Sequence, residues 1–86
     1  MLQNVTSPAT SMPMHDIISH MNGNDADQRF TAVQTSRKIL SRERNPPIDD
    51  FINAGLVPLL VQFLDMPDPF LQFEAAWALT NIASGV

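Results

Sequence analysis

Cysteine is absent from the 86-residue sequence, and glycine is scarce at three residues. Without thiols the chain can form neither disulfide bonds nor thiolate metal sites, which fits a reducing compartment. No apolar run is long enough to span a bilayer, and no signal-peptide pattern is present. These absences disfavour a disulfide-rich secreted domain and a membrane protein. The length allows one small domain.

Positive charge is also scarce, with five Lys and Arg against nine Asp and Glu and a net charge of −4. An acidic chain is a poor general binder of nucleic acids or anionic membranes and is compatible with basic partners. The hydrophobic share of 44% is too high for a chain that is disordered throughout. Residues 1–13 differ, because they are polar, lack Lys and Arg and show no periodicity. We predict a disordered arm there.

The remainder of the chain has the punctuation of an all-helical protein. Asn24 can cap a long second helix, and Gly55 can end the third. Asp68 followed by Pro69 is typical of a helix start, with the aspartate as the cap. The fourth helix is so apolar that we expect it to be buried. No stretch alternates well enough to predict a strand. The expected helices cover residues 14–21, 25–43, 47–54, 58–64 and the segment that follows residue 68.

The last helix is expected to have two unlike faces. The stripe expected to be buried consists of Leu71, Ala75, Leu79 and Ile82, flanked by Ala76, Ala78 and Ala83. The opposite face holds Phe73, Glu74, Trp77, Thr80, Asn81 and Ser84. The single tryptophan of the chain therefore lies on the more polar face, one turn before an asparagine. This placement requires an explanation.

Two interpretations of the pair are open on periodicity alone. In the first, Trp77 packs under a neighbouring helix and Asn81 is solvated, since aromatic residues at helical spacing usually belong to the core. In the second, the pair forms a binding ridge. An indole offers an apolar plate for a side-chain stem and a π face for a cation. An asparagine amide can bond a peptide N–H and C=O together. Such a ridge suits an extended, basic peptide.

An internal repeat favours a stacked architecture. At a shift of 43 residues, Gln34 and Lys38 occupy the positions of Trp77 and Asn81. A period in the low forties, with a short, a buried and a long helix in each unit, is typical of armadillo or HEAT solenoids. The earlier unit resembles a cap, and the later one is the first to carry the full ridge. The matching pairs are Phe30 and Phe73, Ala32 and Ala75, Ile39 and Ile82, and Ser41 and Ser84.

Long segments of the sequence resemble the importin alpha family. Residues 41–50 (SRERNPPIDD) and 54–58 (AGLVP) are similar to the start of its armadillo domain, and residues 71–85 (LQFEAAWALTNIASG) to its first complete repeat. The resemblance extends over residues 14–86. It implies an all-α armadillo (ARM) solenoid with a partial, capping repeat at 14–45 and a complete repeat at 46–86. It also implies a nuclear import adaptor, found in cytoplasm and nucleus, that binds basic nuclear localisation signals.

The resemblance also implies which residues contact the peptide. Trp77 would be the wall against which lysine stems lie, and Asn81 would hold the peptide backbone. Ser84 and Gly85 match positions that help to form the pocket for the key lysine. The positions at the N-terminal lip of the groove correspond to Leu40 and Arg42. No catalytic residue, metal or cofactor is implied.

The sequence departs from the family at both ends. The family begins with a basic segment that binds importin beta and inhibits the groove, whereas residues 1–13 contain no Lys or Arg. Residues 1–13 therefore give no basis for predicting importin beta recruitment or autoinhibition, and both stay open. The later repeats are missing too, so one Trp/Asn pair should bind weakly. We expect a fragment or truncated product whose Leu79 side exposes an apolar patch.

Other classes of function have less support. His15 and His20 are five residues apart, not the i, i+4 spacing of a helical metal pair, and no catalytic motif accompanies them. Nucleic-acid binding could be argued from the four basic residues at 37–44, but a helix C-terminus explains these charges more simply. An armadillo scaffold for another partner remains an alternative, and so does a truncated product without a function of its own.

Overall fold

The computed structural model describes residues 12–42 and 44–85, which form five α-helices. Within these ranges there is no strand, so the predicted all-α class is confirmed. The predicted disordered arm falls almost entirely outside the described residues. No helix of the described part is both long and apolar enough to cross a membrane. The helices are α1 (Met14–Asn22), α2 (Ala26–Arg42), α3 (Ile48–Asn53), α4 (Leu56–Phe63) and α5 (Pro69–Ser84).

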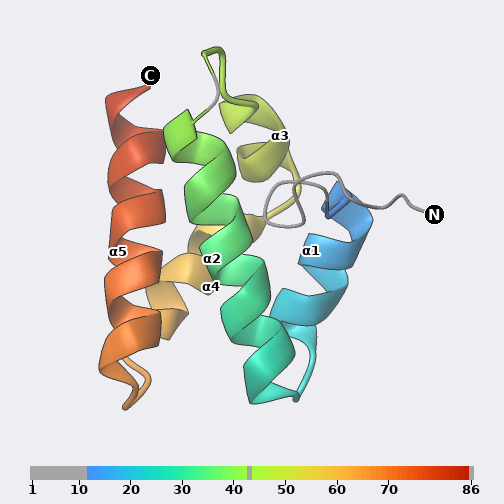
Figure 1. Ribbon diagram of the computed structural model, residues 1–86, viewed down its shortest axis with the longest axis vertical. Coiled ribbons are helices and arrows are strands. Elements are labelled where there is room, and N and C mark those ends of the chain that lie inside the picture. The colour runs from blue at the N-terminus through green and yellow to red at the C-terminus, as the bar shows by residue number, and fades with distance from the viewer. Residues whose placement is uncertain (1–11, 43, 86) are drawn as a thin grey trace, which may run out of the picture.

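The two long helices, α2 and α5, lie side by side and form the most extensive helix pair of the molecule (Figure 1). Helix α1 packs against the other flank of α2, and α4 passes behind α2 and α5. The short helix α3 leads into α4. Helix α5 begins 43 residues after α2, which is the period of the repeat. The equivalent long helices of the two units therefore pack against each other.

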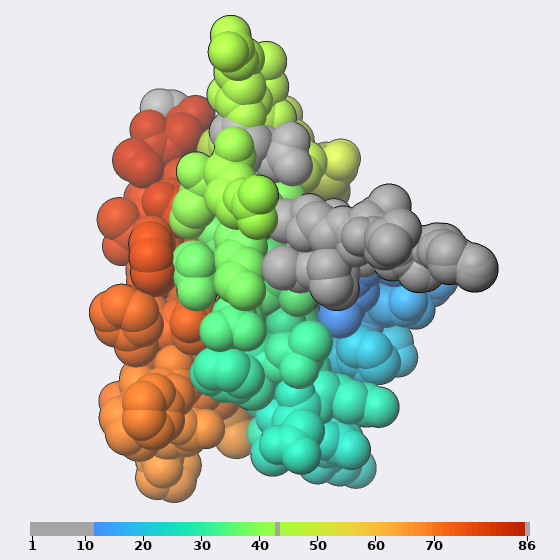
Figure 2. All heavy atoms as spheres, in the orientation of Figure 1, coloured from blue at the N-terminus to red at the C-terminus, as the bar shows by residue number. Residues whose placement is uncertain are grey.

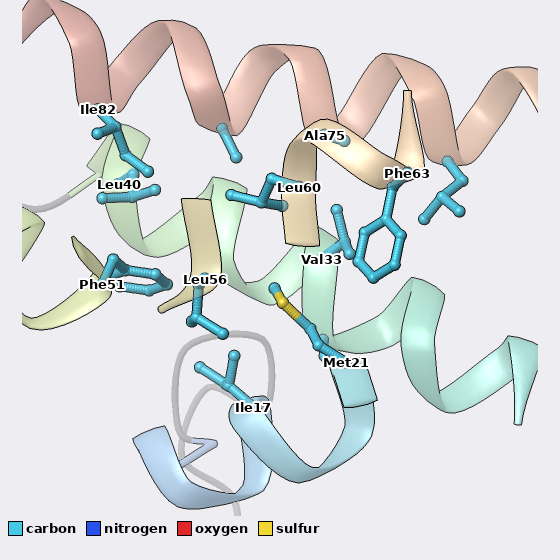
Figure 3. Close-up of a cluster of buried hydrophobic side chains, with 13 residues drawn as sticks. Ile17, Met21, Val33, Leu40, Phe51, Leu56, Leu60, Phe63, Ala75 and Ile82 are labelled. Carbon is cyan, nitrogen blue, oxygen red and sulfur yellow. The ribbon is translucent and has the colours of Figure 1, made fainter. Parts of the chain in front are cut away.

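One core runs through all five helices (Figure 3). Phe51 from α3 and Leu60 from α4 are fully buried. Burial of such side chains supplies most of the folding free energy in a domain of this size. The buried apolar residues are Ile17, Met21, Ala32, Val33, Leu40, Phe51, Leu56, Leu60, Phe63, Leu71, Ala75, Ala78 and Ile82.

Aspartate caps begin both long helices in the same way. The Asp25 carboxylate accepts from the backbone N–H of Asp27 and Gln28, at 2.9 and 3.0 Å. The Asp68 carboxylate accepts from Phe70 and Leu71, at 3.0 and 3.3 Å. The predicted Asp68 cap is confirmed. The predicted Asn24 cap is wrong, because α2 begins at Ala26, one residue later than expected, and Asp25 therefore occupies the capping position.

The turn between α3 and α4 is made by Gly55, whose φ of 77° lies in the left-handed region that favours glycine. Gly55 therefore ends α3, as the sequence predicts. Helix α4 begins two residues earlier than expected, since Pro58 lies within its first turn, where a missing N–H costs nothing. The expectation that α4 is buried holds for Leu56, Leu60 and Phe63, whereas Val61 is 51% exposed. Neither long helix covers that face.

The faces of α5 also differ in part from the expected ones. Leu71, Ala75 and Ile82 are buried as predicted, but Leu79 is only partly buried, and Ala76 and Ala83 are exposed. The expected exposure of the Leu79 side is therefore present in part. Glu74 was assigned to the polar face, yet it is only 7% exposed. The ion pair with Arg37 on α2 explains why this carboxylate can be buried.

Candidate functional site

Three of the predicted site residues form an exposed row along α5. Trp77 is 40% exposed, Asn81 one turn later is partly exposed, and Ser84 is exposed. We call these three residues the Trp–Asn ridge. Trp77 does not lie beneath another helix of the described chain, so the first of the two interpretations does not describe this structure. Figure 2 shows the surfaces of α2 and α5 adjoining along the molecule, and contacts from α2 reach the ridge as described below.

The indole of Trp77 is held by an aromatic and a cationic neighbour. The Phe73 ring packs against it in an edge-to-face arrangement, with centroids 5.6 Å apart and an interplanar angle of 70°. On α2, the guanidinium carbon of Arg37 lies 4.2 Å from the centroid of the Trp77 ring. This is the geometry of a cation–π contact. The indole therefore already accepts a cation from its own chain.

Arg37 also forms a two-point ion pair with Glu74. Its Nε donates to Glu74 Oε1 at 2.6 Å and its NH2 group to Oε2 at 3.1 Å. Gln34 Nε2 donates to the same carboxylate at 3.4 Å. These hydrogen bonds, the one from Arg37 above all, hold the pKa of Glu74 below its ordinary value, although burial acts in the opposite direction. The carboxylate of Glu74 is thus engaged within the protein.

The amide of Asn81 is tied to α2 as well. Its Nδ2 donates to the hydroxyl oxygen of Ser41 at 2.7 Å. The Ser41 hydroxyl donates its own hydrogen to the backbone carbonyl of Arg37, also at 2.7 Å. Among the residues that the structure describes, no other group bonds the side-chain oxygen or the second amide hydrogen of Asn81, so both can serve a ligand. One donor and one acceptor are what a peptide backbone unit requires.

The remaining α5 positions lie at the C-terminal end of the helix. The Ser84 hydroxyl donates to the carbonyl of Thr80 at 2.8 Å, which leaves its oxygen lone pairs available as acceptors. Gly85 donates its backbone N–H to the carbonyls of Asn81 and Ile82 and closes the helix. A Cβ at Gly85 would overlap the Cδ1 atom of Ile48. A larger residue at this position would therefore require the end of the Ile48 side chain to shift, because α3 approaches α5 closely here.

The two α2 positions of the predicted site are placed differently from each other. Arg42 is exposed at the end of α2. Leu40 is only 5% exposed and belongs to the core (Figure 3). Its side chain therefore supports α2 from within. The structure brings Trp77, Asn81 and Ser84 together on α5.

Sequence reasoning missed three residues that contact the ridge: Arg37, Ser41 and Glu74. A charge inside the apolar stretch that precedes Trp77 was a signal that Glu74 needs a partner. The basic residues of α2 were assigned to the helix dipole instead. The sequence marks Ser41 as the repeat partner of Ser84 and as the first residue of segment 41–50, and neither feature points to a contact with Asn81. No group of three or more potential metal ligands occurs among the residues that the structure describes.

Comparison with known proteins gives consistent matches. Residues 44–84 match the family model described as armadillo/beta-catenin-like repeat. The chain is similar to importin subunit alpha-3 of Caenorhabditis elegans, with 59% identity over 68 residues, which are 79% of this chain and 13% of that protein. It is also similar to importin subunit alpha-8 of Mus musculus, with 51% identity over 73 residues, 84% of this chain and 15% of that protein.

A third relative, importin subunit alpha-B of Dictyostelium discoideum, is 51% identical over 70 residues, 80% of this chain and 14% of that protein. The chain therefore spans about one seventh of the length of the curated relatives it matches. Together with the five-helix structure, these matches confirm the predicted armadillo solenoid class.

Proposed function

Because the chain belongs to the importin alpha family of armadillo-repeat proteins, we propose that it contributes to nuclear import by binding basic nuclear localisation signals. The ligand is an extended, lysine-rich peptide that lies along the Trp–Asn ridge. Cargo proteins that carry such peptides are the proposed partners, and importin beta is the proposed partner of the family more generally. The proposed location is the cytoplasm and the nucleus.

The observation that carries this proposal is the exposed indole of Trp77 one turn from the Asn81 amide. The aliphatic stem of a lysine packs on the indole, where burial of its methylene groups is favourable. The peptide backbone pairs with the free oxygen and the second amide hydrogen of Asn81. The acidic net charge of −4 favours association with a basic segment.

The other predicted positions complete the proposed groove. Ser84 offers an exposed acceptor oxygen to a lysine ammonium, and Gly85 presents backbone without a side chain at the same end of α5. Arg42 lines the N-terminal lip from α2, and Leu40 supports that lip from the core. A capping unit at 14–45 and a complete unit at 46–86 are also part of the proposal.

Binding by a single ridge is expected to be weak, since affinity in stacked repeats adds over linked pockets. The test is a titration of the full chain with a synthetic peptide that contains a run of lysines, followed by Trp77 fluorescence. A saturable change that weakens in Asn81→Ala supports the proposal. A matched peptide with glutamines in place of the lysines is the control.

The same titration separates the proposal from its alternatives. Equal binding of an acidic or an apolar peptide would favour an armadillo scaffold for another kind of partner. Absence of any response, in a chain that unfolds cooperatively on heating, would contradict peptide binding by this ridge alone. Absence of cooperative unfolding would instead indicate a truncated product without an independent function.

A further inference from the structure

Two residues of α2 match the spacing of the Trp–Asn pair on α5. Arg37 and Ser41 are one helical turn apart, as Trp77 and Asn81 are, and each contacts the member of the pair that faces it. We propose that Arg37 and Ser41 are positioning residues that fix the orientation of Trp77 and Asn81 for a peptide. This inference rests on the proposed function and names the part of the preceding unit that completes the site.

The Arg37 guanidinium can hold the indole because it is planar. Its edge donates to Glu74 while its face lies over the Trp77 ring, and both contacts use the same rigid group. Glu74 and Trp77 are three residues apart on α5, so they lie on the same side of the helix. Arg37 cannot leave the indole without also leaving a buried carboxylate unpaired. The rotamer of Trp77 is therefore coupled to the ion pair.

This arrangement has a consequence for the ligand. The chain's own cation already covers one region of the Trp77 ring, and a second cation there would be repelled. The exposed part of the indole is left for the apolar stem of a lysine. The ammonium group must then find oxygen acceptors beyond the ring, and Ser84 is the ridge residue that offers an exposed hydroxyl.

Ser41 determines which way the Asn81 amide points. Its hydroxyl hydrogen is committed to the carbonyl of Arg37, so its oxygen can only accept in the direction of Asn81. An amide rotated by 180° would bring its oxygen to the Ser41 oxygen, with no hydrogen between them. The side-chain oxygen of Asn81 is thereby directed away from Ser41. A preset amide loses less conformational entropy when the peptide binds.

The test of Ser41 uses the full 86-residue chain and the lysine-run peptide. Ser41→Ala removes the acceptor and is expected to weaken binding about fivefold, the effect of one neutral hydrogen bond. Ser41→Thr keeps the hydroxyl and is expected to restore affinity. In an Asn81→Ala background, Ser41→Ala should have no further effect, because the two residues act through one contact. Additive effects in this cycle would overturn the assignment of Ser41.

The test of Arg37 uses quenching of Trp77 fluorescence by acrylamide. Arg37→Lys keeps the charge but loses the planar stack, so the quenching constant is expected to rise. The double variant Arg37→Gln with Glu74→Gln should also raise the quenching constant, and it leaves no unpaired buried charge. Arg44→Lys, at an exposed position just after α2, is the matched control and should leave quenching unchanged. Unchanged quenching in Arg37→Lys would overturn the assignment of Arg37.

A spectroscopic readout keeps this inference separate from the proposed function. In the absence of peptide, Ser41→Ala should shift the side-chain amide resonances of Asn81 in the NMR spectrum, while those of Asn53, exposed at the end of α3, stay in place. If the wild-type chain binds no peptide but these resonances shift, positioning stands and the proposed function fails. If the wild-type chain binds peptide and the resonances do not move, the positioning role of Ser41 is refuted.

Discussion

Helices α2 and α5 are built on the same template and end with different surfaces. Asp25 and Asp68, 43 residues apart, cap their helices through the same pair of backbone N–H groups. Ser41 and Ser84 both donate their hydroxyl hydrogen to the carbonyl four residues earlier. The shared features lie in the start, the buried side and the back-bonded serines of each helix. They define the framework of one repeat unit.

The two helices differ in the residues of their exposed row. They also differ in whether another helix packs on the face that holds Val33 in α2 and Ala76 in α5. Where α5 carries Trp77 and Asn81, α2 carries Gln34 and Lys38. Val33 on α2 is fully buried, whereas its counterpart Ala76 on α5 is exposed. Helix α2 is enclosed by α1 on one flank and α5 on the other, while the main contacts of α5 in the described chain are with α2 and α4. One helix serves as support, and the other presents the ridge.

The strongest contrast is expected from the same substitution at matched positions. Val33→Glu places an unpaired carboxylate in the core and should cost more than about 3 kcal/mol, enough to unfold a chain of this size. Ala76→Glu adds a solvated, helix-favouring side chain and should stay within about 0.5 kcal/mol. Urea unfolding followed by circular dichroism measures both. Similar losses of stability at the two positions would mean that the face of α5 that holds Ala76 is also packed against other residues.

The ion pair between α2 and α5 provides the second contrast. Arg37→Gln leaves the Glu74 carboxylate buried without its cation and should lower the free energy of unfolding by about 3 kcal/mol. Arg37→Gln combined with Glu74→Gln should recover most of that loss. Thr80→Gln, at the position on α5 that matches Arg37, is exposed and should change stability by less than about 0.5 kcal/mol. Equal effects of the single and double variants would contradict a buried pair.

Acid should weaken the same contact. The pKa of Glu74 is lowered in the folded chain from an ordinary value of 4.5. A lowered pKa stabilises the fold above that value, and the contribution is lost as the pH falls through the folded pKa. The thermal unfolding midpoint should therefore fall more steeply between pH 7 and pH 3 in the wild-type chain than in the double variant Arg37→Gln with Glu74→Gln. Parallel curves for the two proteins would argue against this contribution of Glu74.

The smallest effects are expected at the two caps, which the comparison treats as equivalent. Asp25→Ala and Asp68→Ala should each lower the free energy of unfolding by about 1 kcal/mol. Asp65→Ala, at an exposed position outside the helices, is the matched control with an expected change near zero. A much larger loss at one cap would show that the two helix starts are not equivalent. Denaturant midpoints resolve differences of this size.

Much of this organisation could be predicted, because it depends on short-range patterns. Asp68 followed by Pro69, and Gly55 between two helices, act within a few residues, and the structure has them as expected. The cap of α2 was misplaced by one residue because Asn24 and Asp25 are both good caps. The 43-residue shift matches Asp25, and not Asn24, to the cap Asp68, so the repeat itself identifies Asp25 as the cap.

What could not be predicted depends on partners distant in the sequence. Glu74 is buried only because Arg37 reaches it from another helix, and no local pattern specifies that meeting. Leu79 belongs to the apolar stripe of α5, but its burial depends on what packs over it. The contacts of Arg37 and Ser41 with the ridge follow from the register of α2 against α5. That register requires the packed structure.

The most direct test of the account is an NMR titration of the full chain with the lysine-run peptide. Binding at the ridge of α5, and not at its counterpart on α2, is the central claim. We predict saturable shifts of the Trp77 indole N–H and the Asn81 side-chain amide, with little change at the side-chain amide of Gln34. Shifts confined to α2, or no saturable shift in a folded chain, would contradict it.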